Sequence, residues 1–95
     1  YYRLAQALSN EDRHKEAVVA YQQALDNDID EKDVADVYFW RGISQMQLED
    51  WDVATASFRE AAKDKDKEKS SRRYIKYIAG EKRRQAALRE MLSGS

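Results

Sequence analysis

The sequence predicts an all-α fold built from paired helices. The 95 residues contain no proline and only three glycines, while alanine, leucine, glutamine and the charged residues are abundant. Such a composition strongly favours helix. Apolar side chains recur three and four residues apart, which is the spacing of one helix face, in five segments divided by polar residues. A chain of this length forms one domain with a modest core.

Polar residues divide the chain into five expected helices. Their ranges are 1–8, 13–25, 32–48, 51–63 and 70–92. Each break holds residues that favour turns and caps, such as SNED after the first helix and DNDIDEKD after the second. We expect DKDKEKSS to be a charged connection or a frayed extension of the fourth helix. We expect the fifth helix to run unbroken through Gly80.

Acidic residues mark two of the expected helix starts. Asp30 followed by Asp33 resembles a capping box for the third helix. Asp50 is the expected N-cap of the fourth helix. Carboxylates are favourable at both places because the N-terminus is the positive end of a helix dipole.

The second and fourth helices share a stripe of a small, a large and a small side chain. The two stripes, 37 residues apart, are Ala17–Tyr21–Ala24 and Ala54–Phe58–Ala61. At about 100° per residue, each set falls within roughly 60° of one helix face, so another backbone can approach closely at both ends. Gly42 costs roughly 1 kcal/mol relative to alanine inside a helix, so a close neighbour is expected there too. The recurrence predicts a repeated two-helix unit.

These features resemble the tetratricopeptide repeat, in which a small residue lies inside the first helix and the small–large–small stripe lies on the second. The matching residues are Tyr1, Leu4, Ala5, Leu8, Ala17, Tyr21 and Ala24 in the first unit and Tyr38, Gly42, Ala54, Phe58 and Ala61 in the second. The sequence departs from the family in three ways. Its period is 37 instead of the usual 34, the closing proline is absent, and Arg41 and Gln45 replace a leucine and a frequent aromatic residue.

The resemblance implies antiparallel helix-turn-helix repeats stacked as a short right-handed α-solenoid. Within one domain, we expect a first repeat that lacks its opening residues at 1–29, a second repeat at 30–66, a capping helix at 67–92 and a tail at 93–95. Repeats of this kind bury a continuous core only by stacking, and about three are needed for independent stability. We therefore expect the chain to be a piece of a longer array.

Catalytic chemistry is not expected from this sequence. His14 is the only histidine and there is no cysteine, so no metal set can be completed from these residue types. His14 falls at a repeat position that is often aromatic and half buried, which favours packing. The three glycines are isolated, so no phosphate-binding loop is present. We expect no enzyme activity, no metal and no cofactor.

Charge is polarised along the chain. Residues 69–95 hold eight basic and two acidic side chains, a net of +6, whereas the whole chain has a net charge of −1. A solvated helix, an acidic protein partner and an acidic neighbouring repeat each fit this pattern. The basic residues surround the helix without forming one stripe, so nucleic acid is not an expected partner. No apolar run approaches the ~20 residues of a membrane span, so direct membrane insertion is not expected, and the compartment is left open.

The family resemblance implies a protein-interaction scaffold. In this family the first helix of each unit lines a concave groove that receives an extended or helical partner segment. The matching groove residues are Tyr2, Gln6, Ser9, Asn10, Asp36, Phe39, Ile43, Met46 and Gln47, to which the fifth helix would add Ile75 and Ala79. An exposed strip of aromatic residues and methionine is typical of an interaction hot spot.

Two alternatives remain open for the groove. Neighbouring repeats or a second copy of the chain would cover it if the segment were a spacer or self-association element of a larger bacterial envelope or assembly protein. A subset of the family also grips the acidic tails of heat-shock chaperones with a clamp of lysine, asparagine and arginine. The matching positions here hold Tyr2, Gln6 and Trp40, so we expect no such clamp.

Overall fold

The fold is helical, as the sequence predicts, with adjacent helices packed as a helical repeat solenoid. The computed structural model describes residues 2–27 and 29–94, and in those ranges it holds no strand. The elements are α1 (Tyr2–Asn10), α2 (His14–Asp26), η1 (a 3-10 turn, Glu31–Asp33), α3 (Val34–Gln47), α4 (Trp51–Ala61) and α5 (Lys65–Ser93). The match of Tyr1 to the first unit lies outside the described residues.

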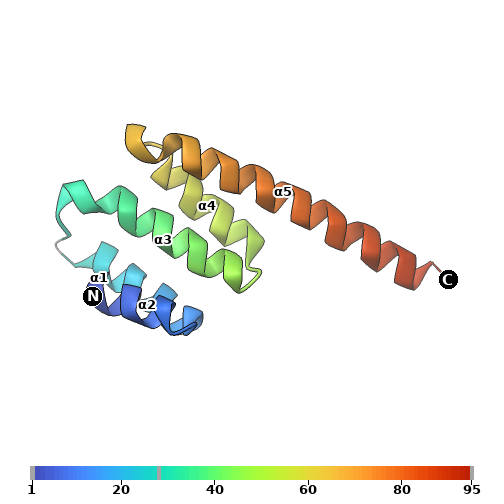
Figure 1. Ribbon diagram of the computed structural model, residues 1–95, viewed down its shortest axis with the longest axis horizontal. Helices are drawn as coiled ribbons and strands as arrows, with labels where there is room; N and C mark the ends of the chain where they lie inside the picture. The colour runs from blue at the N-terminus through green and yellow to red at the C-terminus, as the bar shows by residue number, and fades with distance from the viewer. Residues whose placement is uncertain (1, 28, 95) are drawn as a thin grey trace.

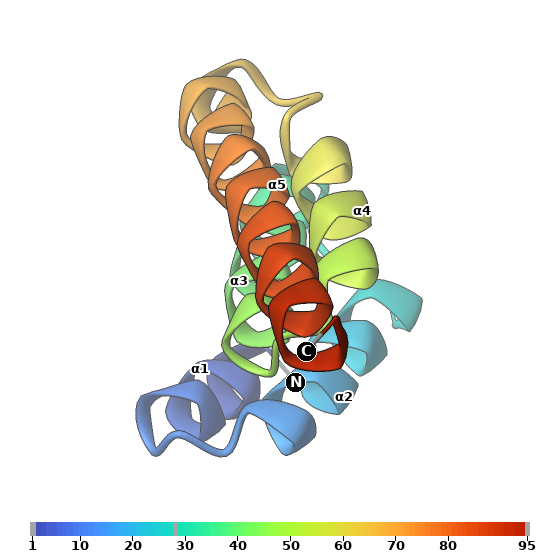
Figure 2. The same ribbon diagram turned by 90° about the vertical axis from the view of Figure 1, so that its right-hand side faces the viewer.

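The helices stack in the order of the sequence. Each helix packs mainly against the one before and the one after it, and α3 also contacts α1 and α5. Figure 2 shows α1 and α3 on one side of the stack, with α2 and α4 on the other. In Figure 1, α5 packs against α4 on the side away from α2 and then continues beyond the rest of the molecule. The first helices of the two units and the first half of α5 therefore form one layer.

The turns inside the two units have the same geometry, 37 residues apart. Asp12 and Glu49 both adopt φ of 59°. In the first turn the Arg13 amide donates to the Leu8 carbonyl at 2.8 Å, and in the second the Asp50 amide donates to the Gln45 carbonyl at 3.0 Å. Such a left-handed residue followed by a six-to-one bond is the Schellman ending of a helix. The repeat predicted from side chains thus recurs in the backbone.

The small–large–small stripes form the centres of two core clusters. The side chains of both stripes are buried, Tyr21 in the first cluster and Phe58 in the second. A Cβ added to Gly42 would lie 3.0 Å from the Cε1 and Cζ atoms of Phe58. The close approach expected at Gly42 is therefore confirmed. Burial raises the pKa of Tyr21 to about 12, because the neutral phenol is favoured in this apolar setting.

Arg41, which stands where the family usually has leucine, supports a polar network between helices. Its Nε donates to Ser57 Oγ at 2.9 Å, and its guanidinium also donates to Gln22 Oε1. Ser57 Oγ in turn donates to Gln45 Oε1 at 2.5 Å. The buried hydroxyl of Ser57 therefore accepts a hydrogen bond from Arg41 and donates one to Gln45. The two unusual residues thus supply the partners that a buried polar group needs. Burial lowers the pKa of Arg41.

Asp50 is the N-cap residue of α4, as expected, although its side chain makes no cap hydrogen bond. Two other expected helix starts need correction. Asp30 accepts a hydrogen bond from the Lys32 amide and so caps η1, not α3. The run DKDKEKSS is neither a connection nor part of α4, because α5 already begins at Lys65. Asp64 accepts from the Asp66 amide at 2.8 Å, and this cap starts the helix five residues earlier than expected. The expected continuity through Gly80 is confirmed.

The packing of α4 against α3 predicts unequal effects of one substitution at two positions. Ala54 is fully buried and Ala56 is exposed on the same helix. Ala54→Leu should lower the free energy of unfolding by about 1–3 kcal/mol, because overpacking forces the two helices apart. Ala56→Leu should change it by less than about 0.5 kcal/mol. Urea unfolding monitored by circular dichroism measures both values, and an equal loss in both variants would contradict the assigned faces.

Candidate protein-binding groove

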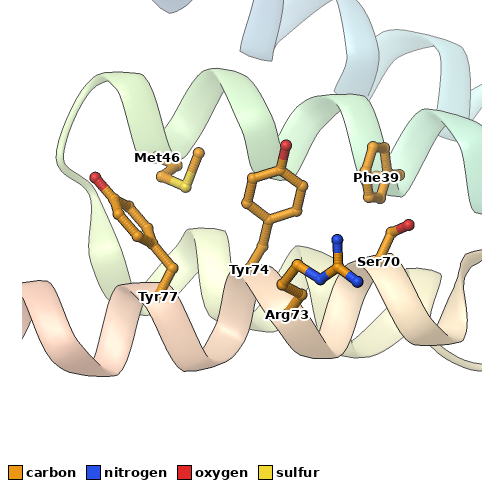
Figure 3. A pocket seen from close by; sticks show the side chains of 6 residues that line it. All are labelled: Phe39, Met46, Ser70, Arg73, Tyr74 and Tyr77. Atoms are coloured by element: carbon orange, nitrogen blue, oxygen red, sulfur yellow. The ribbon is translucent and has the colours of Figure 1, made fainter.

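A hollow of about 400 Å³ lies between α3 and α5. Its lining consists of Phe39, Met46, Ser70, Arg73, Tyr74 and Tyr77. Figure 3 shows Arg73 and Ser70 near Phe39 at one end, with Tyr77 and Met46 at the other. Rings and a thioether provide most of this surface, and one guanidinium provides its positive charge. We refer to it as the α3–α5 hollow.

The floor of the α3–α5 hollow is aromatic. Phe39 meets Phe58 and Tyr74 edge-on, with ring centroids 5.6 and 5.7 Å apart, and Tyr74 stacks on Phe58 at 5.1 Å. Phe39 is only 8% exposed, whereas the family resemblance predicts that it belongs to an exposed strip. That expectation is wrong because Tyr74 of α5 covers much of its ring.

An ion pair lies beside Phe39, at one end of the hollow. Lys67 Nζ of α5 lies 3.1 Å from Asp36 Oδ1 of α3 and 5.1 Å from the centre of the Phe39 ring. The resemblance predicts that Asp36 faces a partner, and in the structure its carboxylate is instead paired within the chain.

The groove residues predicted from the first unit lie in a separate place. Gln6, Ser9 and Asn10 line a smaller hollow of about 210 Å³ between α1 and α3, together with Tyr21 and Trp40. Ser9 and Ser44 Oγ atoms, 3.2 Å apart, link α1 to α3 nearby.

The other predicted groove residues differ in exposure. Tyr2 packs against Tyr21, with ring centroids 6.4 Å apart, and its pKa is raised by burial and by the charges of Asp36 and Asp33. Ile43 packs against the second core cluster, while Gln47 is exposed. The structure thus distributes the predicted strip over two hollows and the core beside them.

The register expected for α5 is wrong by two residues, which turns the helix by more than half a turn. Ile75 and Ala79 face α4, where they line a depression with Thr55 and Arg59. Their expected positions in the groove are taken by Arg73 and Tyr77. The three extra residues of the 37-residue period lie between α2 and α3, whereas α4 and α5 are joined by a short turn.

The family's usual period of 34 gives the correct register for α5. Residues 34 positions after Asp36, Phe39 and Ile43 are Ser70, Arg73 and Tyr77. All three of these later residues line the α3–α5 hollow. The signal is therefore present in the sequence, but the longer spacing between the two units conceals it.

His14 of α2 lies between the exposed Asp12 and the buried Ser44 of α3. Its Nδ1 atom is 3.4 Å from Ser44 Oγ, and its Nε2 atom is 3.6 Å from Asp12 Oδ1. Ser44 is fully buried, and the contact joins the two units. In the described ranges 2–27 and 29–94, no group of three His, Asp or Glu side chains could hold a metal ion, and no helix is long and apolar enough to cross a bilayer.

Tyr74 and Tyr77 should differ in what they contribute to stability. Tyr74→Ala should lower the free energy of unfolding by about 2 kcal/mol, because it removes the ring stacked on Phe58. Tyr77 is 53% exposed, so Tyr77→Ala should cost less than about 0.5 kcal/mol. Thermal melts of the two variants give the comparison. A larger loss for Tyr77→Ala would mean that the α5 register described above is incorrect.

Comparison with known proteins agrees with the architecture. Residues 1–28 match the sequence profile described as Tetratricopeptide repeat. No curated protein and no solved structure matches the chain. Members of this family generally mediate protein interactions and are generally not enzymes. Residues 1–28 are thus similar to a tetratricopeptide repeat, which supports the resemblance inferred from the sequence.

Proposed function

We propose that the chain is a non-catalytic interaction module that binds a segment of a partner protein in the α3–α5 hollow. The observation that supports this most directly is the open aromatic lining. Tyr77 is 53% exposed beside Met46, at the end of the hollow opposite Phe39. Aromatic residues carry much of the binding energy at protein interfaces, and methionine adapts to ligands of varied shape. Pockets of a few hundred Å³ with such a lining suit apolar groups.

The charge at the rim favours a segment that is apolar and also carries an acidic residue. Arg73 lines the hollow, and within the part of the chain that the structure describes it makes no ion pair. A guanidinium can make charge-assisted hydrogen bonds to a carboxylate. We therefore propose a partner segment with leucine, isoleucine or phenylalanine at the centre and aspartate or glutamate beside it.

Acidic tails without apolar side chains should not bind. The clamp positions of the chaperone-binding subset hold Tyr2, Gln6 and Trp40, none of which is a cation. Arg73 alone cannot provide the several convergent donors that a terminal carboxylate and an aspartate would need. Binding should consequently depend more on apolar burial than on salt concentration.

A peptide library displayed on phage and selected against the immobilised chain tests the proposal. Selected 12-residue peptides should carry a large apolar residue next to an acid. Fluorescence anisotropy of one such peptide should show that Tyr77→Ser weakens binding about tenfold, as loss of an exposed hot-spot ring does. Val53→Ser is the matched control, because Val53 is 50% exposed on α4 and lies outside the α3–α5 hollow.

Two results would contradict the proposal. The first is equal binding to the wild type and to Tyr77→Ser. The second is selection of acidic peptides that have no apolar residue and whose binding disappears at high salt. Light scattering at several concentrations examines the competing occupant, a second copy of the chain. A dimer that Tyr77→Ser converts to a monomer would favour the self-association element over partner binding.

A further inference from the structure

We propose that the segment bound in the α3–α5 hollow is an acidic amphipathic α-helix, which packs along α5 from the hollow to the far end of that helix. This inference rests on the function proposed above and names the class of partner for the same site. It follows from the part of α5 that continues past the other helices, from the spacing of its side chains, and from its charge.

In the described ranges, Gln85 is the last residue of α5 with a hydrogen bond to another element. Trp51 Nε1 donates to Gln85 Oε1 at 3.0 Å, and Gln85 Nε2 donates to Glu49 Oε1 at 2.6 Å. One turn earlier, Lys82 Nζ lies 2.6 Å from Asp52 Oδ1. Beyond these contacts the helix continues to Ser93, and residues 86–94 are all exposed. Figure 1 shows this end of α5 extending past α3 and α4.

One stripe joins the α3–α5 hollow to this exposed end. Its members, which we call the α5 stripe, are Tyr74, Tyr77, Glu81, Arg84, Leu88 and Met91. They follow one another at spacings of three and four residues. This is the heptad pattern of the side chains that pack against a second helix in a coiled coil. Leu88 is 46% and Met91 72% exposed, so the outer end of the stripe is apolar and open. Arg84 and Glu81 pair with each other at 2.6 Å in its middle.

The geometry of the α5 stripe favours a helical partner over an extended one. The stripe covers 18 residues, so it is about 26 Å long, which a partner helix of about 18 residues would match. An extended segment needs backbone partners for its own N–H and C=O groups. The backbone N–H and C=O groups of the outer part of α5 are hydrogen-bonded within its own helix, so they cannot pair with those of an extended segment. A helix satisfies its backbone internally and needs only side-chain contacts.

Charge decides between a different protein and a second copy. The cations of α5 that make no ion pair in the described ranges are Lys65, Lys69, Arg73, Lys76, Arg83 and Arg89. Spacings of four, three and seven residues place Lys69, Arg73, Lys76 and Arg83 along one side of the α5 stripe. A second α5 would bring like charges together, which is unfavourable at an interface. Glutamate or aspartate along the flank of a partner helix would be attracted.

The experiment uses a synthetic 21-residue peptide with leucine at the two apolar heptad positions and glutamate at the flanking positions. Its binding to the full chain is measured by fluorescence anisotropy, and its helicity by circular dichroism. The peptide should gain helix on binding. Leu88→Ser combined with Met91→Ser should weaken its binding about tenfold or more. The same double variant should bind the short display-selected peptide as the wild type does.

The matched control is Ala79→Ser combined with Ala86→Ser. Both alanines are exposed on α5, seven residues apart, on the side of the helix away from the α5 stripe. This control should bind the 21-residue peptide like the wild type. Circular dichroism of both double variants checks that α5 is still helical, so a loss of binding reports the lost side chains.

The outcomes separate this inference from the proposed function. If the Leu88 and Met91 variant binds the helical peptide like the wild type while Tyr77→Ser does not, the helical partner is overturned and the hollow remains the binding site. Absence of saturable binding of the helical peptide to the wild type, with the short peptide still bound, has the same consequence. If neither variant changes either affinity, both proposals fail. A wild-type dimer that the Leu88 and Met91 variant loses would assign the surface to a second copy.

Discussion

The ring of Phe58 is the contact on which the rest of the structure depends. On one side it lies against the backbone of Gly42, where even a Cβ atom would be 3.0 Å from the ring. On another side it stacks on Tyr74 at 5.1 Å, and it meets Phe39 edge-on. One side chain of α4 thereby sets the distance to α3 and the position of α5. Since α3 and α5 are the two walls of the candidate groove, the same ring determines its width and its floor.

The repeat itself could be predicted from the sequence because it depends on local spacing. Ala54, Phe58 and Ala61 share a helix face whatever the loops around them do. Gly42 indicates a close neighbour because glycine destabilises a helix interior relative to alanine, so its presence there needs a packing reason. The turns at Asp12 and Glu49 then follow from two helix pairs of the same design. Features of this kind depend on residues within one or two helical turns of each other.

The site could be predicted only in part, because it depends on register between helices. Met46 is a predicted groove residue and lines the α3–α5 hollow, whereas the sequence assigned Arg73, Tyr74 and Tyr77 no place in the groove. Their positions depend on where α5 begins, which Asp64 determines by capping the helix at Lys65.

Asp36 and Phe39 illustrate a second limit of prediction from the sequence. Both occupy the predicted face of α3, but Lys67 and Tyr74 from α5 cover them. Spacing within α3 shows which side chains share a face. It contains no information about which of them a later helix will cover.

The central claim is that the partner binds in the α3–α5 hollow, whose walls Phe58 positions, and along the α5 stripe that continues from it. Hydrogen exchange of backbone amides, compared between the free chain and its complex with the acidic helical peptide, tests it most directly. Residues 86–93 are exposed and follow Gln85, the last residue of α5 that the described part of the chain shows hydrogen-bonded to other elements, so their amides should exchange rapidly in the free chain. In the complex, these amides and those near Tyr77 should exchange more slowly. Protection confined to α1 and α2, with residues 86–93 unchanged, would contradict the account.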